Sequence, residues 1–224
     1  MDQRLAETFA QEHRIAIEHV VREEHEMLLL RGLCESRLGS QLVFKGGTAL
    51  RLAYGSPRFS DDLDFSAIGS ILTDEFIRLA ETLGKMHPQM VLAEALSKRF
   101  TLFALYIVRY TYLLYPLSIK IEISTRRESW KSKEDFRLRL LTSEFTNVTV
   151  LAQVATLERL WTDKTRAWTA RKQPRDLYDL WFIGQKLKQE VEVDLSGLDQ
   201  RLIRRELRKY LPYAHWKVIE QWLA

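Results

Sequence analysis

The segment from residue 41 to residue 66 constrains the fold most strongly, because its backbone must change conformation several times over a short distance. The residue types predict, in order, a strand (41–45), a double-glycine turn (46–47), a helix that Thr48 starts and that continues to about Tyr54, a break (55–57) and a second strand (62–66). A strand, turn, helix and strand in this order indicate a mixed α/β unit.

The second strand carries two carboxylates on one face. Side chains alternate along a strand, so Asp62 and Asp64 face one way while Leu63 and Phe65 face the other. Carboxylates held close together repel each other, and a divalent cation relieves that repulsion. The pattern predicts that Asp62 and Asp64 bind Mg²⁺; the alternative is a pair of surface charges on an edge strand. Asp61 is interpreted as a turn or capping residue.

The glycine turn adds a second feature that points to phosphate binding. A glycine-rich start of a helix lets backbone N–H groups approach an anion, and the helix dipole favours negative charge there. Gly46, Gly47 and Thr48 are therefore candidates for holding a nucleotide triphosphate, and Thr48 is also a candidate N-cap. The turn and the two aspartates together predict metal-dependent nucleotidyl transfer.

Residues 118–124 alternate regularly and supply the third candidate ligand. Ile119, Ile121 and Ile123 face one side of the predicted strand, and Lys120 and Glu122 face the other. Glu122 is expected to complete the metal site and to act as base toward the incoming hydroxyl, with Lys120 neutralising phosphate charge. The alternative is an ion pair between these two residues on the strand face.

The rest of the chain is predicted to add helices on both sides of this unit. Helices are expected over 2–38, 73–85, 89–98, 154–170, 174–188, 196–210 and 213–223, a strand over 100–115, and irregular structure over 126–150 that ends in a short strand near 148–150. The prediction is an α+β protein with a small mixed sheet and flanking helices over 1–152, followed by a helical domain over 153–224 that closes the cleft.

Charge is distributed unevenly along the chain. Residues 1–97 carry 10 Lys and Arg against 15 Asp and Glu, and residues 98–224 carry 24 against 15. The basic second half predicts a polyanionic partner, although a solvated face that binds nothing is the alternative. A single cysteine, no signal-peptide core and no long apolar run predict a cytoplasmic protein without membrane contact.

Two blocks resemble a known family. The run from Phe44 to Phe65 resembles the first motif of the DNA polymerase β-type nucleotidyltransferase superfamily, and more narrowly that of the AbiEii/AbiGii toxins. A second block, 157–164 followed by 174–181, is similar to a helical motif of the same family. That resemblance implies that Lys164 binds nucleotide phosphate and that Asp176 lies near the site. The helical pattern alone would leave the Lys164 ammonium in solvent, and Arg175 and Asp176 paired with each other.

The resemblance implies a nucleotidyltransferase fold, Mg²⁺ or Mn²⁺, and a nucleoside triphosphate substrate. It further implies an RNA acceptor such as tRNA, a cognate antitoxin, and a role in a type IV toxin–antitoxin or abortive-infection system. Many superfamily members have Asp where this chain has Glu122. The alternatives are a nucleotidyltransferase that modifies a small molecule or protein, and a non-catalytic module that binds nucleotide or RNA.

Overall fold

The computed structural model describes residues 1–191, 195 and 198–223. The helices are α1 (Gln3–His13), α2 (Ile17–Cys34), α3 (Gly46–Tyr54), α4 (Thr73–Lys85), α5 (Leu157–Arg171), α6 (Pro174–Leu187) and α7 (Gln200–Tyr210), with 3₁₀ segments at Gly39–Gln41 and Tyr213–Trp222. The strands are β1 (Leu42–Lys45), β2 (Asp62–Ala67), β3 (Met90–Lys98), β4 (Thr101–Val108), β5 (Leu117–Ser124), β6 (Phe136–Ser143) and β7 (Thr146–Ala155).

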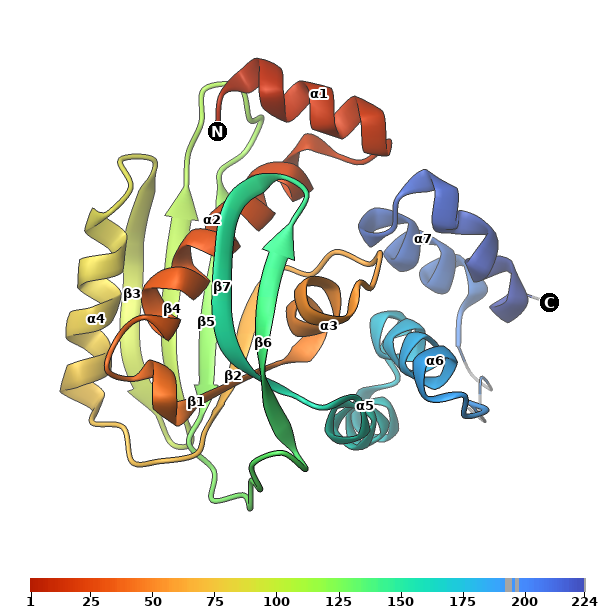
Figure 1. Ribbon diagram of the computed structural model, residues 1–224. Helices are drawn as coiled ribbons and strands as arrows, with labels where there is room; N and C mark the ends of the chain where they lie inside the picture. Colours follow the sequence, from red (N-terminus) through yellow and green to blue (C-terminus); the bar gives the residue numbers. More distant parts are fainter. Residues whose placement is uncertain (192–194, 196–197, 224) are drawn as a thin grey trace.

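The strands form one mixed sheet in the order β3-β4-β5-β2-β1-β7-β6 (Figure 1). Strands β2 and β5 are parallel, as are β1 and β7, whereas the other neighbours are antiparallel. The parallel pairing of β2 with β5 matters for the site, because it places their outward-facing side chains level with each other.

Two hydrophobic cores hold the helices to the sheet. The first lies between the sheet and helices α2 and α4, and includes the fully buried side chains of Leu63, Phe65 and Ile121. The second joins α3 to the C-terminal helices α5, α6 and α7 through residues such as Leu50 and Tyr178. Figure 1 shows these C-terminal helices gathered beside α3, away from α4.

Several sequence predictions are confirmed. The strands predicted at 62–66 and 118–124 are β2 and β5, and the helix predicted at 73–85 is α4. The C-terminal part is helical as expected, although its last helix is a 3₁₀ segment. The predicted start of the helix over 196–210 falls on residues outside the described ones; α7 begins at Gln200.

Other predictions are wrong. The helix predicted over 2–38 is two helices, because Arg14 adopts a left-handed conformation (φ 51°) that ends α1. Residues 89–98 form strand β3, and 126–150 contains most of the β6–β7 hairpin. The strand predicted over 100–115 ends at Val108. None of the helices described here has the length and apolar character needed to cross a membrane.

Candidate functional site

The carboxylates predicted to act together lie on neighbouring strands. Asp62 and Asp64 are on one side of β2, since Leu63 and Phe65 on the other side are buried. The register of the parallel pair β2–β5 sets Asp62 level with Lys120, and Asp64 level with Glu122. The sequence therefore predicted correctly that these four side chains occupy one face.

Gly46 brings the start of α3 directly against Asp64. Its φ of +82° is in the left-handed region, and a Cβ added there would lie 2.4 Å from Asp64 Oδ2. Only glycine leaves room for the carboxylate at this point without backbone strain. Helix α3 begins at Gly46, so the positive end of its dipole faces the acidic group.

Gly47 and Thr48 lie in the first turn of α3. A Cβ on Gly47 would come within 2.3 Å of Arg58 Nη2 and 2.7 Å of Ser60 Oγ, so this glycine allows the loop before β2 to pack closely. Thr48 is not the N-cap, because the helix starts two residues earlier. Its buried hydroxyl donates a hydrogen bond of 2.6 Å to the backbone oxygen of Asp62 and thereby anchors β2 to α3.

The electrostatics of the site centre on Asp64. Burial raises the pKa of its carboxyl to about 6, the negative charges of Asp62 and Glu122 act in the same direction, and Lys164 opposes them. Lys120 lies at the more exposed end, with its Nζ 3.5 Å from Asp62 Oδ1. The sequence left open an ion pair between Lys120 and Glu122. In the structure, Lys120 pairs with Asp62 instead.

Lys164 reaches the site from α5 and is held by two buried acids of α6. Its Nζ lies 2.6 Å from Asp179 Oδ2 and 3.2 Å from Asp176 Oδ1, and both carboxylates are fully buried. The interpretation of Lys164 as a lysine that extends into solvent is wrong, because the residue is only 9% exposed. Asp176 lies near the site, where both of its oxygens are engaged by cationic side chains.

Two arginines complete this ion network, and the sequence interpretation assigned neither a role. Buried Arg58 donates to Asp179 through Nε and Nη2, at 2.7 and 2.9 Å. Arg171 of α5 donates to Asp176 at 2.7 and 2.9 Å, so the arginine that pairs with Asp176, beside Lys164, is Arg171 and not Arg175. Although burial alone would raise them, these ion pairs hold the pKa values of Asp176 and Asp179 below their usual range.

Asp61 has a structural role, but its contacts are with distant helices and not those of the turn or capping residue that was expected. Its carboxylate accepts a 2.6 Å hydrogen bond from the Tyr210 hydroxyl of α7 and lies 3.1 Å from Arg22 Nε of α2. Phe59 adds a backbone hydrogen bond to the Tyr210 carbonyl, at 2.8 Å. The loop before β2 is thereby attached to helices from both ends of the chain.

The donor set of the site suits Mg²⁺ by its chemistry. Within the described residues, however, no group of three or more His, Cys, Asp or Glu side chains is placed so that it could hold a metal ion, so Asp62, Asp64 and Glu122 are not gathered into a three-carboxylate site. Mg²⁺ prefers oxygen ligands, and in nucleotide enzymes it commonly takes one or two carboxylates together with waters and substrate phosphates. Asp62 and Asp64, on one strand face with Glu122 beside them, offer that kind of donor set.

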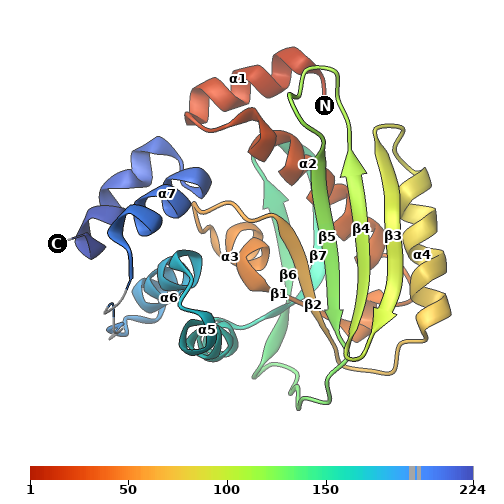
Figure 2. The ribbon, with the colours of Figure 1, turned by 180° about the vertical axis from the view of Figure 1, so that it is seen from behind.

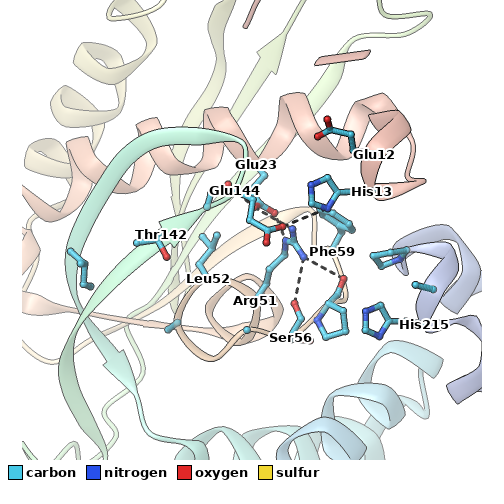
Figure 3. A pocket seen from close by; sticks show the side chains of 17 residues that line it. Glu12, His13, Glu23, Arg51, Leu52, Ser56, Phe59, Thr142, Glu144 and His215 are labelled. Atoms are coloured by element: carbon cyan, nitrogen blue, oxygen red, sulfur yellow. Dashed lines mark hydrogen bonds and ion pairs between the residues drawn. The ribbon is translucent and has the colours of Figure 1, made fainter. Parts of the chain in front are cut away.

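A cavity of about 770 Å³ lies at the opposite end of α3 and does not contain these carboxylates (Figure 3). Arg51 is at its centre, paired with Glu23 and stacked 3.7 Å from the centre of the Phe59 ring. Its guanidinium also donates to the carbonyls of Ser56 and Pro57. These contacts join α2, α3 and the loop before β2. They therefore hold in place the two elements next to the aspartates, α3 and the loop that leads into β2.

Comparison with solved structures shows that the chain shares its fold with nucleotidyltransferases. The chain is similar to MenT4, a nucleotidyltransferase toxin of Mycobacterium tuberculosis H37Rv, with a TM-score of 0.65 and 20% identity over 92% of this chain and 68% of that one. It is similar to JHP933 from Helicobacter pylori, with a TM-score of 0.59 and 19% identity over 93% and 94%. A putative nucleotidyltransferase from H. pylori gives 0.56 and 23% over 76% and 70%. No curated protein matches the chain.

The family comparison extends over most of the sequence. Residues 28–220 match the family described as "Nucleotidyl transferase AbiEii toxin, Type IV TA system". The match includes the glycine turn, both aspartates of β2, Glu122 and the ion network around Lys164. This chain belongs to the AbiEii family of nucleotidyltransferase toxins of type IV toxin–antitoxin systems.

Proposed function

We propose that this protein transfers a nucleoside monophosphate from a nucleoside triphosphate to an RNA acceptor, tRNA in particular, and depends on Mg²⁺ or Mn²⁺ held by Asp62, Asp64 and Glu122. The observation that carries the proposal is the placement of Asp64 against Gly46 at the start of α3, level with Glu122 on β5. Acidic oxygens for a cation and backbone N–H groups for phosphates thus lie side by side.

Each candidate residue then has a role. The backbone of Gly46, Gly47 and Thr48 holds the triphosphate, and Lys164 and Lys120 neutralise its charge. Asp176 acts through Lys164, whose ammonium it holds in place. When bound, the divalent cation would stabilise the phosphate charge that develops during transfer.

At the α-phosphorus, the reaction forms one bond and breaks one. The acceptor hydroxyl oxygen attacks the α-phosphorus, the anhydride bond to the β-phosphate breaks, and pyrophosphate leaves. Glu122 accepts the proton of the attacking hydroxyl, which its position beside Asp64 on the same sheet face supports.

The C-terminal part, residues 153–224, is proposed to close over the cleft and to dock the acceptor RNA through phosphates. Helix α7 presents exposed cationic side chains at Arg201, Arg204, Arg205, Arg208 and Lys209. A cognate antitoxin that restrains the activity, in a toxin–antitoxin or abortive-infection setting, is part of the proposal.

The test is transfer of label from each of the four α-³²P nucleoside triphosphates to total RNA, with Mg²⁺ and then with EDTA. The wild type is compared with the double variant Asp62→Asn, Asp64→Asn, whose folding is checked by circular dichroism. Label in RNA that requires both the metal and the aspartates supports the proposal. If pyrophosphate is released and the label appears on protein or on a small molecule, the acceptor belongs to that class and not to RNA. Nucleotide binding without any product would favour a binding module.

A further inference from the structure

One face of strands β3, β4 and β5 is covered by helices, and the other is not. Along β5 the side chains of Ile119, Ile121 and Ile123 are buried on the side of α2 and α4, while Lys120 is exposed and Glu122 is half-buried. In β4, the Tyr106 hydroxyl donates to the Ala80 carbonyl of α4, which fixes the covered side. Seen from behind, no helix among the described residues lies in front of these three strands, and α2 passes on their far side (Figure 2).

The uncovered face is continuous with the catalytic carboxylates. The strand register forms two rows that start at the aspartates of β2 and end at the sheet edge. One row is Asp64, Glu122, Phe103 and Leu96; the other is Asp62, Lys120, Leu105 and Glu94. The face is therefore acidic at the catalytic centre and farther out carries the apolar side chains of Phe103, Leu105 and Leu96, with the exposed Glu94 at the sheet edge.

The outer part of this face combines an aromatic ring with cations. Phe103 is only 7% exposed, Lys98 Nζ lies 3.9 Å from the centre of its ring, and Lys98 itself is exposed. Lys120, with 46% of its side chain exposed, lies between Leu105 of β4 and Asp62 of β2, and Glu122 lies between Phe103 and Asp64. Aromatic rings stack with nucleobases, and lysines at the edge of such a platform contact phosphates.

Access to the aspartates is restricted on their other side. Helix α3 begins against Asp64, and Lys45 of β1 is level with Asp64 in the strand register, so α3 borders the centre on the β1 side. An acceptor whose hydroxyl must reach Glu122 meets fewer obstacles along β4 and β5.

We infer that the uncovered face of β3, β4 and β5 binds the last nucleotides at the reactive end of the acceptor RNA. Phe103 stacks with a base after Lys98 moves off the ring, and Lys98 and Lys120 contact phosphates. This inference rests on the proposed function for its acceptor class, but it concerns a surface that the proposed function did not assign.

The first test measures binding of a 5′-labelled single-stranded oligoribonucleotide to the full chain by fluorescence anisotropy, without nucleoside triphosphate. Lys98→Glu is compared with Lys85→Glu, an equal charge reversal at an exposed position of α4 on the covered side. Lys98→Glu is expected to weaken binding about tenfold and to reduce the salt dependence by about one phosphate contact. Lys85→Glu should change affinity less than about twofold. Equal effects of the two substitutions would overturn the inference.

The second test locates the RNA end and does not need catalysis. RNA with 4-thiouridine at its 3′ terminus is crosslinked to the wild type and to Phe103→Leu, and the labelled peptides are identified by mass spectrometry. Crosslinks within residues 94–122, and affinity about fivefold or more weaker in a folded Phe103→Leu protein, are the expected results. Crosslinks confined to α5, α6 and α7 would overturn the inference.

The two tests separate this inference from the proposed function. Crosslinks on the uncovered face without nucleotide transfer by the wild type would refute the proposed function alone. If label is transferred to RNA but the crosslinks lie on the C-terminal helices only, the inference about the uncovered face is refuted and the proposed function stands.

Discussion

Removing Asp179 should destabilise the protein more than any exposed charge does. Its carboxylate is fully buried and accepts hydrogen bonds from Arg58 and Lys164, whose side chains are 3% and 11% exposed. Asp179→Ala leaves the buried guanidinium without its partner and weakens the hold on the lysine. Breaking a buried ion pair on one side costs about 3–5 kcal/mol, because an uncompensated charge stays in a low-dielectric interior.

The expected loss is a large part of the total stability of a domain, and it should lower the midpoint of thermal unfolding by roughly 6–20 °C. Urea unfolding followed by tryptophan fluorescence measures the free energy directly. The double variant Arg58→Met, Asp179→Leu should recover part of the loss. It removes the Arg58 guanidinium, which Asp179→Ala alone would leave buried without a partner.

The control is Glu134→Ala, which breaks the exposed pair of Lys131 and Glu134, with side chains 66% and 70% exposed. That change should cost no more than about 1 kcal/mol. If Asp179→Ala and Glu134→Ala destabilise the protein equally, the reasoning about the buried network is wrong.

Three further predictions concern the surroundings of the aspartates. Gly46→Ala should cost about 1–3 kcal/mol in urea unfolding and reduce nucleotide transfer, because φ is +82° and the new Cβ would lie 2.4 Å from Asp64 Oδ2; unchanged stability would contradict this. Without metal, the folded protein binds the Asp64 proton more tightly than the unfolded chain, since burial raises the pKa from 3.8 to about 6. The unfolding free energy should therefore fall as pH rises from about 4 to 6 relative to Asp64→Asn, and a parallel pH profile of the two proteins would refute it. Tyr210→Phe should cost about 1.5–3 kcal/mol in thermal unfolding, because it removes the donor to the Asp61 carboxylate; a change within error would show that Arg22 suffices.

The sequence was most informative where local pattern and chemistry agree. Alternation along β5 and β2 predicted which side chains are buried, and the glycine turn predicted where an anion or a carboxylate can approach a helix start. Strand alternation predicted that Asp62 and Asp64 share one face of β2, whereas Glu122 was chosen because the chemistry calls for a third carboxylate; only the pairing of β2 with β5 places it on the same sheet face.

The sequence failed where distant partners decide the conformation. Residues 93–96 are Ala, Glu, Ala and Leu, which favour a helix, yet pairing with β4 makes them part of an edge strand. In β6, the exposed Leu138 and Leu140 disguise the burial pattern of a strand. The ion pair of Arg58 and Asp179 joins residues 121 positions apart, and local spacing gives no sign of such a contact.

The central claim is that Asp62 and Asp64 are the catalytic carboxylates, and their neighbour Asp61 provides the sharpest comparison. The decisive measurement is the rate of nucleotide transfer to RNA, with saturating Mg²⁺, for Asp62→Asn and for Asp61→Asn. We expect a loss of at least about 100-fold for Asp62→Asn, because the charge beside the reacting phosphate is removed. Asp61→Asn should lose less than about tenfold, because its carboxylate contacts Arg22 and Tyr210 and acts through structure. Equal losses in the two variants, or full activity in Asp62→Asn, would contradict the account.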